Sequence, residues 1–347
     1  MRRETSAPDH RFDNWRLSCF RQVALFLFSL ALSLPGAPAA RAPELLRLEA
    51  NVEAMGTTFS VALYGVDRDR MEAAVEAAFA EARRLDRMLS NYRPGSEWSR
   101  LNREAAEHPV GVSRELFDLL AACLRYSQAS EGAFDITVGP LMKIWGFYRG
   151  SGRLPAREEV QAALARVGYK NIVLDAENLT VRFARPGVEI DPGGIGKGYA
   201  VDRMVTVLKE HGITSALMSA SGSSIYALGA PPAESRGWEV RIRHPRDETQ
   251  TVETLYLKNE SLSTSGSYEK FFVAEGKTYS HIMDPRTGYP ATGMLSVSVV
   301  APKTIDSEAW TKPFFVLGRS WTIRNKPKDM RVFLCEDKAE LQCAWLP

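Results

Sequence analysis

Four glycines crowd one short segment of this sequence, residues 191–202, which reads DPGGIGKGYAVD. We expect an apolar strand before the segment and a helix after it, and glycine permits the unusual φ angles and close backbone approach of such a turn. The free N–H groups and positive dipole end of a helix N-terminus bind anions, and Lys197 adds a compact positive charge. The segment therefore indicates a phosphate-binding turn. It matches neither the Walker motif nor the GxGxxG fingerprint, so an ordinary tight turn remains the alternative.

A second segment, residues 280–293 (SHIMDPRTGYPATG), carries a histidine in a constrained turn. His281 stands three residues before Asp284, and Pro285 and Gly288 fix the turn that follows. Histidine is the side chain best suited to general-base work near neutral pH. Asp284 has three available roles: it orients the histidine, contacts a cofactor hydroxyl, or caps the turn.

Three further stretches combine small or polar residues with glycine. Residues 219–224 (SASGSS) and 263–270 (STSGSYEK) are either ligand-facing segments or ordinary loops. Residues 132–141 (GAFDITVGPL) place Phe134 beside Asp135, a pair suited to stacking on a ring and hydrogen-bonding its edge. Core packing explains Phe134 equally well.

The elements that must position these segments follow from hydrophobic periodicity. Helical spacing predicts helices over residues 68–90, 113–130, 158–167, 201–212 and within 306–317. Strands are predicted in residues 46–64, 171–173, 180–183, 188–191, 215–218, 225–228, 238–242, 251–257, 271–273, 295–301 and 331–334. Helices and strands do not alternate strictly, so we expect an α+β fold: a single compact domain with mixed or antiparallel sheets, flanking helices and lobes.

Composition excludes some classes of function. The chain has 347 residues, of which 45% are hydrophobic and 25% charged, as in a soluble globular protein with an ample core. The formal net charge is +2, and no basic block interleaves with aromatic residues. We therefore expect no nucleic-acid partner.

The N-terminal segment has the three parts of a secretory signal. Arg16 and Arg21 precede an uncharged apolar run over residues 23–34, and small residues follow it. The pattern predicts a cleaved signal peptide over residues 1–39 and an exported domain over residues 40–347, with a retained membrane anchor as the alternative.

Two cysteines lie near the C-terminus, where Cys335 ends and Cys343 begins a short apolar segment. In an oxidising compartment they are candidates for a disulfide that bridges a hairpin. Two unpaired buried thiols are the alternative.

Eight segments occur in a fixed order: MGTTFS at 55–60, LDRMLSNYRPGSEWSRLN at 85–102, GAFDITVGPL at 132–141, DPGGIGKGYAVD at 191–202, SASGSSIYALG at 219–229, STSGSY at 263–268, HIMDPRTGYP at 281–290 and FFVLG at 314–318. Together they resemble the ApbE family of flavin transferases, over roughly residues 46–318. The resemblance implies an α+β domain with FAD in a cleft between lobes, and a requirement for Mg²⁺. Such enzymes move FMN from FAD to a Thr or Ser hydroxyl of a target protein and release AMP.

The resemblance also implies a location for the protein and two alternative activities. Similar proteins act in the periplasm, on the outer face of the bacterial inner membrane. Some members mainly hydrolyse FAD to FMN and AMP, so an FAD pyrophosphatase is one alternative. An exported FAD-binding protein with little or no turnover is another.

Individual roles follow from the same resemblance. The residues expected to contact FAD are Met55, Tyr92, Ala133, Phe134, Asp135, Lys197, Asp202, Gly222, Ile282 and Asp284. Met55 and Tyr92 would meet the flavin at the mouth of the site. Lys197 would contact the phosphates during the reaction, and His281 would accept the proton of the acceptor hydroxyl.

The sequence departs from the family pattern at the expected metal site. The resemblance places the backbone carbonyl of Gly196 and the carboxylate of Glu308 on Mg²⁺, with glutamate instead of the family's aspartate. Lys312 stands where the family has a metal-binding threonine, and an ammonium offers no lone pair. Its repulsion from a divalent ion at about 4 Å, with an effective dielectric constant of about 20, amounts to roughly 8 kcal/mol.

Three arrangements of this site are open. Lys312 swings out to solvent and water replaces the threonine, or it pairs with Glu308 and replaces the metal, or the site is broken. Pro313 disfavours helical geometry at Lys312, so a helical i, i+4 pairing with Glu308 is not assured. Thr311 and Asp306 are candidate substitute ligands.

Overall fold

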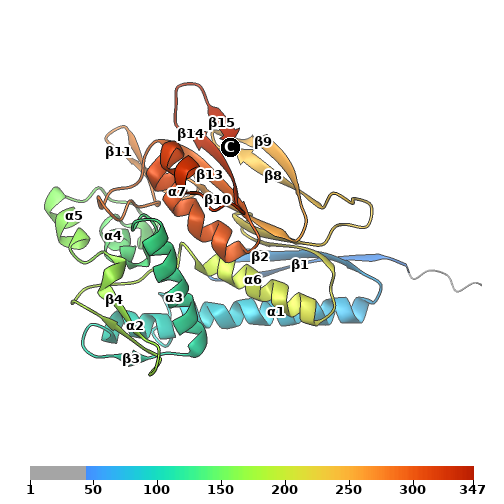
Figure 1. Cartoon of the computed structure of the whole chain (residues 1–347), viewed down its shortest axis with the longest axis horizontal. Helices are drawn as coiled ribbons and strands as arrows, with labels where there is room; N and C mark the ends of the chain where they lie inside the picture. The colour runs from blue at the N-terminus through green and yellow to red at the C-terminus, as the bar shows by residue number, and fades with distance from the viewer. Residues whose placement is uncertain (1–43) are drawn as a thin grey trace, which may run out of the picture. The chain divides into compact units, whose positions relative to one another are not determined.

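An eight-stranded sheet in which all neighbouring strands are antiparallel forms the centre of the structure (Figure 1). Its strands, in spatial order, are β1 (Leu46–Ala54), β2 (Thr57–Gly65), β6 (Ser215–Ala220), β7 (Ser224–Leu228), β10 (Glu260–Gly266), β13 (Met294–Ala301), β14 (Arg331–Glu336) and β15 (Gln342–Trp345). The structure is a computed structural model and describes residues 44–347, so the predicted signal peptide lies outside the described residues.

Three helices pack on one face of this sheet: α1 (Arg68–Leu89), α6 (Gly196–Glu210) and α7 (Thr304–Asn325). Figure 1 shows α6 between the other two. Alternate residues of β2, such as Phe59 and Leu63, are fully buried against helical residues such as Leu85 and Met204. The helix α1 begins after Asp67, whose side chain accepts a hydrogen bond from the Arg70 amide and so caps the helix.

A hairpin covers the opposite face of the sheet. It consists of β8 (Trp238–His244) and β9 (Asp247–Leu257), which pair with each other but not with the main sheet. Its apolar side chains, Trp238 among them, pack against Ala227 and Leu262 of the sheet. Both faces of the sheet are therefore buried, which is why its central strands are almost wholly apolar or small.

A second group of elements forms the other wall of the site. It contains α2 (Glu97–Glu104), α3 (Arg114–Ala129), α4 (Gly139–Ile144), α5 (Arg157–Leu164), the sheet β3 (Val110–Gly111), β5 (Thr180–Phe183) and β4 (Ile172–Asp175), and short 3₁₀ turns at Ile136–Val138, Phe147–Arg149 and Tyr169–Asn171. The small hairpin β11 (Phe271–Ala274) and β12 (Lys277–Ser280) packs through Phe272 and Tyr279 on Trp145. The α+β prediction is confirmed.

Several element predictions need correction. The helix predicted from residue 201 begins five residues earlier, at Gly196, so the glycine segment supplies its first turn. Residues 188–191, predicted as a strand, are in none. Residues 263–266, for which an ordinary loop was one of the two alternatives, belong to the strand β10. There the Ser263 hydroxyl bonds the Ser307 hydroxyl of α7 (2.8 Å). Helix α7 continues through Pro313, kinks at Gly318, where φ is +73°, and ends at Asn325.

The C-terminal hairpin β14–β15 carries the predicted disulfide. Cys335 and Cys343 lie directly opposite each other in the strand register and are bonded. Within residues 44–347, no helix is both long enough and apolar enough to cross a membrane.

Candidate active site

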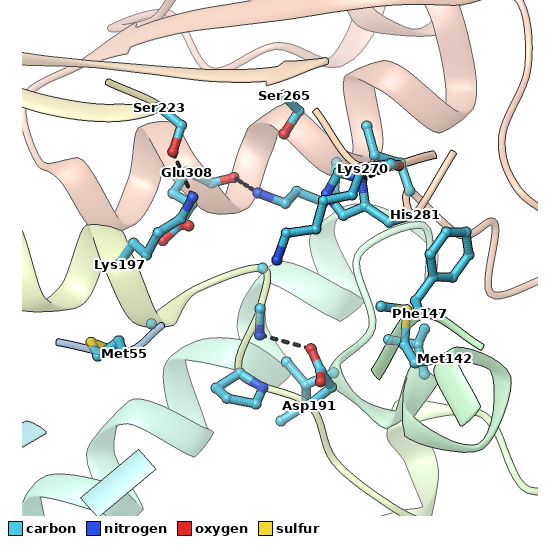
Figure 2. Close-up of a pocket in the computed structure, with 18 of the residues that line it drawn as sticks. Met55, Met142, Phe147, Asp191, Lys197, Ser223, Ser265, Lys270, His281 and Glu308 are labelled. Carbon is cyan, nitrogen blue, oxygen red and sulfur yellow. Dashed lines mark hydrogen bonds between the residues drawn. The ribbon is translucent and has the colours of Figure 1, made fainter. Parts of the chain in front are cut away.

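A cavity of about 540 Å³ collects seven of the eight sequence motifs (Figure 2). The eighth lies just beyond it, although Glu308 and Lys312 on the same helix line the wall. Among the residues expected at the site, those that line the cavity are Met55, Tyr92, Ala133, Phe134, Asp135, Gly196, Lys197, His281, Ile282 and Glu308. Asp202, Gly222 and Asp284 are not among the lining residues.

The glycine turn is shaped by one buried carboxylate. Asp191 accepts hydrogen bonds from the Tyr148 hydroxyl (2.7 Å), the Asn91 amide (3.0 Å) and the backbone N–H of Gly193 (2.8 Å). Burial raises the pKa of Asp191, and these hydrogen bonds oppose the rise. The amides of Gly193, Gly196 and Gly198 are all engaged by partners within the protein. A phosphate at this turn would therefore depend strongly on nearby side-chain cations.

Three lysines that line the cavity supply those cations: Lys197, Lys270 and Lys312. Figure 2 shows Lys197 pointing toward Ser223 beside Glu308, and Lys270 on the side of His281. The ammonium of Lys197 donates to the Ser223 hydroxyl at 2.5 Å, which holds the side chain over the first turn of α6. Lys270 was not selected from the sequence. It ends the segment 263–270, and only folding places it beside the histidine.

His281 is held as a neutral base. Its Nδ1 lies 3.1 Å from the backbone carbonyl of Lys270, so Nδ1 carries the proton and Nε2 is the acceptor. Burial, together with the charges of Lys312, Lys270 and Lys197, lowers the pKa of His281 to about 4, and the hydrogen bond to the Lys270 carbonyl opposes this shift. The imidazole is therefore neutral at pH 7.

Asp284 caps its own turn. Its carboxylate accepts from the Arg286 amide (2.9 Å) and pairs with the Arg286 guanidinium (2.8 Å). Of the three roles that the sequence left open, the structure shows the turn cap. The group that positions His281 is instead the backbone carbonyl of Lys270, which bonds both the backbone N–H (2.9 Å) and the ring Nδ1 (3.1 Å) of the histidine.

The predicted ring-binding pair is fixed in the protein interior. Asp135 accepts from the Thr137 amide (2.8 Å), the Thr137 hydroxyl (2.6 Å) and the Tyr169 amide (2.6 Å). Burial raises the pKa of Asp135, and these bonds oppose it. Phe134 is 2% exposed and meets Tyr126 edge-on. Both residues line the cavity wall, but their side chains chiefly stabilise it.

Asp202 lies outside the cavity and caps a helix. Its two carboxylate oxygens accept from the amides of Thr304 (2.7 Å) and Ile305 (2.9 Å) at the start of α7. Because α6 begins at Gly196, Asp202 is nearly two turns into the helix and away from its anion-binding end. Gly222 sits in the β6–β7 turn with φ +69°, and its amide donates to Ser219 (2.9 Å), while Ser221 and Ser223 on either side line the cavity.

The expected metal ligands do not assemble a metal centre. Glu308 is buried; one carboxylate oxygen accepts from the Gly198 amide at 2.5 Å, and the other has no hydrogen-bond partner among the residues that the structure describes. Within residues 44–347, no group of three or more His, Cys, Asp and Glu side chains is arranged to hold a metal ion. The Thr311 hydroxyl bonds Ser265 (2.7 Å), and Asp306 accepts from the Tyr126 hydroxyl, so neither substitute reaches the cavity.

Lys312 completes this wall and does not swing out to solvent. It stays helical despite Pro313, lines the cavity, and donates to the backbone carbonyl of Glu308 at 3.2 Å rather than to its carboxylate. Burial lowers the pKa of Lys312 to about 8; Glu308 opposes this, and the charge of Lys197 adds to it. The side chain is thus mainly an ammonium at pH 7. An ammonium beside a single carboxylate does not fit a divalent cation.

Comparison with known proteins decides the family. Residues 55–334 match the family model described as "ApbE family". The chain belongs to the ApbE family. Its relatives named FAD:protein FMN transferase include one from Klebsiella pneumoniae, 33% identical over 76% of this chain and 80% of the relative, and one from Escherichia coli K12, 30% identical over 86% and 87%.

Solved structures of the family share the fold. The ApbE protein of Thermotoga maritima superimposes with a TM-score of 0.79 at 30% identity, covering 86% of this chain and 96% of that one. The apo form of the Pseudomonas stutzeri flavinyl transferase ApbE gives 0.77 at 28% identity, covering 87% and 95%. The family similarity thus extends over nearly all of the described residues.

Proposed function

We propose that this chain is an enzyme that moves FMN from FAD to a Thr or Ser hydroxyl of an acceptor protein and releases AMP. Membership of the ApbE family supports the proposal, as does the name shared by its relatives. The observation that carries it is His281, a neutral base whose Nε2 is the acceptor inside a cavity lined by three lysines.

The residues of the cavity would divide the chemistry among them. The acceptor oxygen attacks the FMN phosphorus, His281 takes the hydroxyl proton, and AMP leaves with the bridging oxygen. Lys197 and Lys270 would neutralise the diphosphate, since ammonium groups stabilise charge that develops on phosphate oxygens. Mg²⁺ has no part in these steps, because Glu308 and Lys312 do not fit a divalent ion.

We place the enzyme outside the cytoplasm, in the periplasm or on the outer face of the inner membrane. The apolar run over residues 23–34, with basic residues before it, supports export. The Cys335–Cys343 disulfide is also typical of proteins in oxidising compartments. Expression of the full chain, followed by cell fractionation and N-terminal sequencing, tests this: intact protein in the cytoplasm would refute it.

One incubation tests the reaction. The purified protein is mixed with FAD and an exported redox protein that carries a Thr flavinylation site. AMP is followed by chromatography, and flavin on the acceptor by in-gel fluorescence. We expect AMP and labelled acceptor in equal amounts, and no label on an acceptor whose Thr is replaced by Ala.

Two other results would each replace the proposal. AMP and FMN in solution without labelled acceptor would make the protein an FAD pyrophosphatase. Tight FAD binding with no AMP under any condition would make it a flavin-binding protein.

A further inference from the structure

The wall of the cavity formed by α6 and α7 presents positive charge where a metal ion is expected. Lys312 and Lys197 both line this wall, and Glu308 between them uses a carboxylate oxygen to hold the Gly198 amide. A Cβ built on Gly198 would lie 2.5 Å from the Thr304 carbonyl oxygen and 2.9 Å from Glu308. The carboxylate is therefore part of a tight junction between two helices.

Lys312 is aimed at the glycine turn rather than at solvent. A Cβ built on Gly194 would lie 3.6 Å from the Cε atom of Lys312, so the aminoalkyl chain runs alongside the turn. Its ammonium is tethered to the Glu308 carbonyl at 3.2 Å, which leaves further N–H donors for a ligand. Lys312 is thus anchored beside the glycine turn, the segment expected to bind the diphosphate.

The remaining acidic groups in the cavity have partners of their own. Asp86 pairs with Arg93 and Glu269 with Arg243, while Asp135 and Asp191 are saturated by internal hydrogen bonds. Lys270 also interacts electrostatically with the Asp191 carboxylate, which leaves the ammonium groups of Lys197 and Lys312 to face the two negative charges of a diphosphate. Together these two groups carry the same charge as one divalent ion.

We propose that the Lys312 ammonium replaces the divalent cation in this enzyme and, with Lys197, neutralises the diphosphate, so that FMN transfer needs no metal ion. The inference rests on the proposed function. The bond between the FMN phosphorus and the bridging oxygen breaks, a bond to the acceptor oxygen forms, and the acceptor proton passes to His281. The negative charge left on AMP develops beside Lys312, which stabilises it by hydrogen bonding.

The test compares the wild type with Lys312→Met, Lys312→Thr and the surface control Lys328→Met, each in EDTA and over a Mg²⁺ titration. Lys328 is exposed and far along α7's C-terminal connection, so its loss should change nothing. We expect the wild type to release AMP undiminished in EDTA. Loss of one donor to developing charge lowers kcat by about 10²–10³-fold, so Lys312→Met should lose that much with or without Mg²⁺.

Lys312→Thr distinguishes charge replacement from a packing role. It should be as inactive as Lys312→Met in EDTA and recover when Mg²⁺ is added, because a hydroxyl restores an oxygen ligand. A wild type that is inactive in EDTA and activated by Mg²⁺ would overturn the inference while leaving FMN transfer intact. So would a Lys312→Met variant with full activity in EDTA.

FAD binding provides a readout independent of turnover. Flavin fluorescence should show tight FAD binding by the wild type in EDTA and at least about tenfold weaker binding by Lys312→Met, the loss of one charge-assisted contact. If no AMP forms under any condition, the proposed function fails, and this comparison still decides the role of Lys312: equal affinities in EDTA would refute it. Thermal unfolding of each variant confirms that the proteins compared are folded.

Discussion

Replacing Gly198 by alanine should separate α6 from α7 and weaken the cavity wall that they build. The added Cβ would meet the Thr304 carbonyl at 2.5 Å, a backbone atom that cannot rotate away, and Glu308 at 2.9 Å. Overpacking costs about 1–3 kcal/mol and loss of the amide bond to Glu308 about 1.5–3, whereas alanine regains about 1 in helix propensity. The net loss in the free energy of unfolding is therefore about 1.5–5 kcal/mol.

Urea unfolding followed by far-ultraviolet circular dichroism measures this loss. Gly111→Ala is the matched control, because a Cβ there has no heavy atom within 4 Å; its effect should stay within about 0.5 kcal/mol. FAD affinity should fall in Gly198→Ala and not in the control, since Glu308 and Lys312 move with α7. A Gly198→Ala protein as stable as the wild type would show that the helices do not approach as closely as the structure has them.

Three further predictions concern other parts of the chain. His281→Ala should lower kcat by about 10²–10⁴-fold with FAD affinity little changed. Because the pKa of His281 is lowered to about 4, the wild-type rate should stay constant from neutral pH down to about pH 4, and a decline centred near pH 6.5 would contradict this. Cys335→Ser should cost about 2–3 kcal/mol in chemical denaturation, the loop entropy of a disulfide spanning eight residues, and reductant should have the same effect on the wild type only. Asp202→Ala should lower the free energy of unfolding by about 0.5–2 kcal/mol through loss of the α7 cap. A large drop in FAD affinity with an unchanged free energy of unfolding would instead show that Asp202 contributes to FAD binding.

The sequence predicted helices and strands best where one face is apolar. α1 and α3 match their predicted ranges closely, and the Ser113 side chain caps α3. β10 was missed because its helix-facing residues are serines, which the sequence alone suggests are in a loop. Their hydroxyls bond Ser307 and Thr311 of α7, partners that only the tertiary structure supplies.

The candidate site was predictable as a set of segments and less so as a set of side chains. The order of motifs identified the residues that line the cavity, including Lys197 and His281. It could not place Asp202, because α6 begins earlier than predicted, at Gly196. Asp202 therefore lies within the helix, where its side chain bonds the start of α7. Nor could it predict that Lys312 is helical and that its side chain lines the cavity. Pro313 removes only one helical hydrogen-bond donor, and the packing of α7 outweighs that loss.

The order of strands in the main sheet has a consequence for how the chain folds. β1 and β2 form a local hairpin, but β2 then pairs with β6, where Tyr64 faces Ser215 about 150 residues later in the chain. Closing so long a loop before its contacts are formed slows folding. Until α1 through α6 are made, the β2 edge has unpaired backbone groups, and such edges recruit other chains. Refolding of this protein should therefore be slow and sensitive to protein concentration, with the β2–β6 pairing as the step that joins the β1–β2 hairpin to the rest of the sheet.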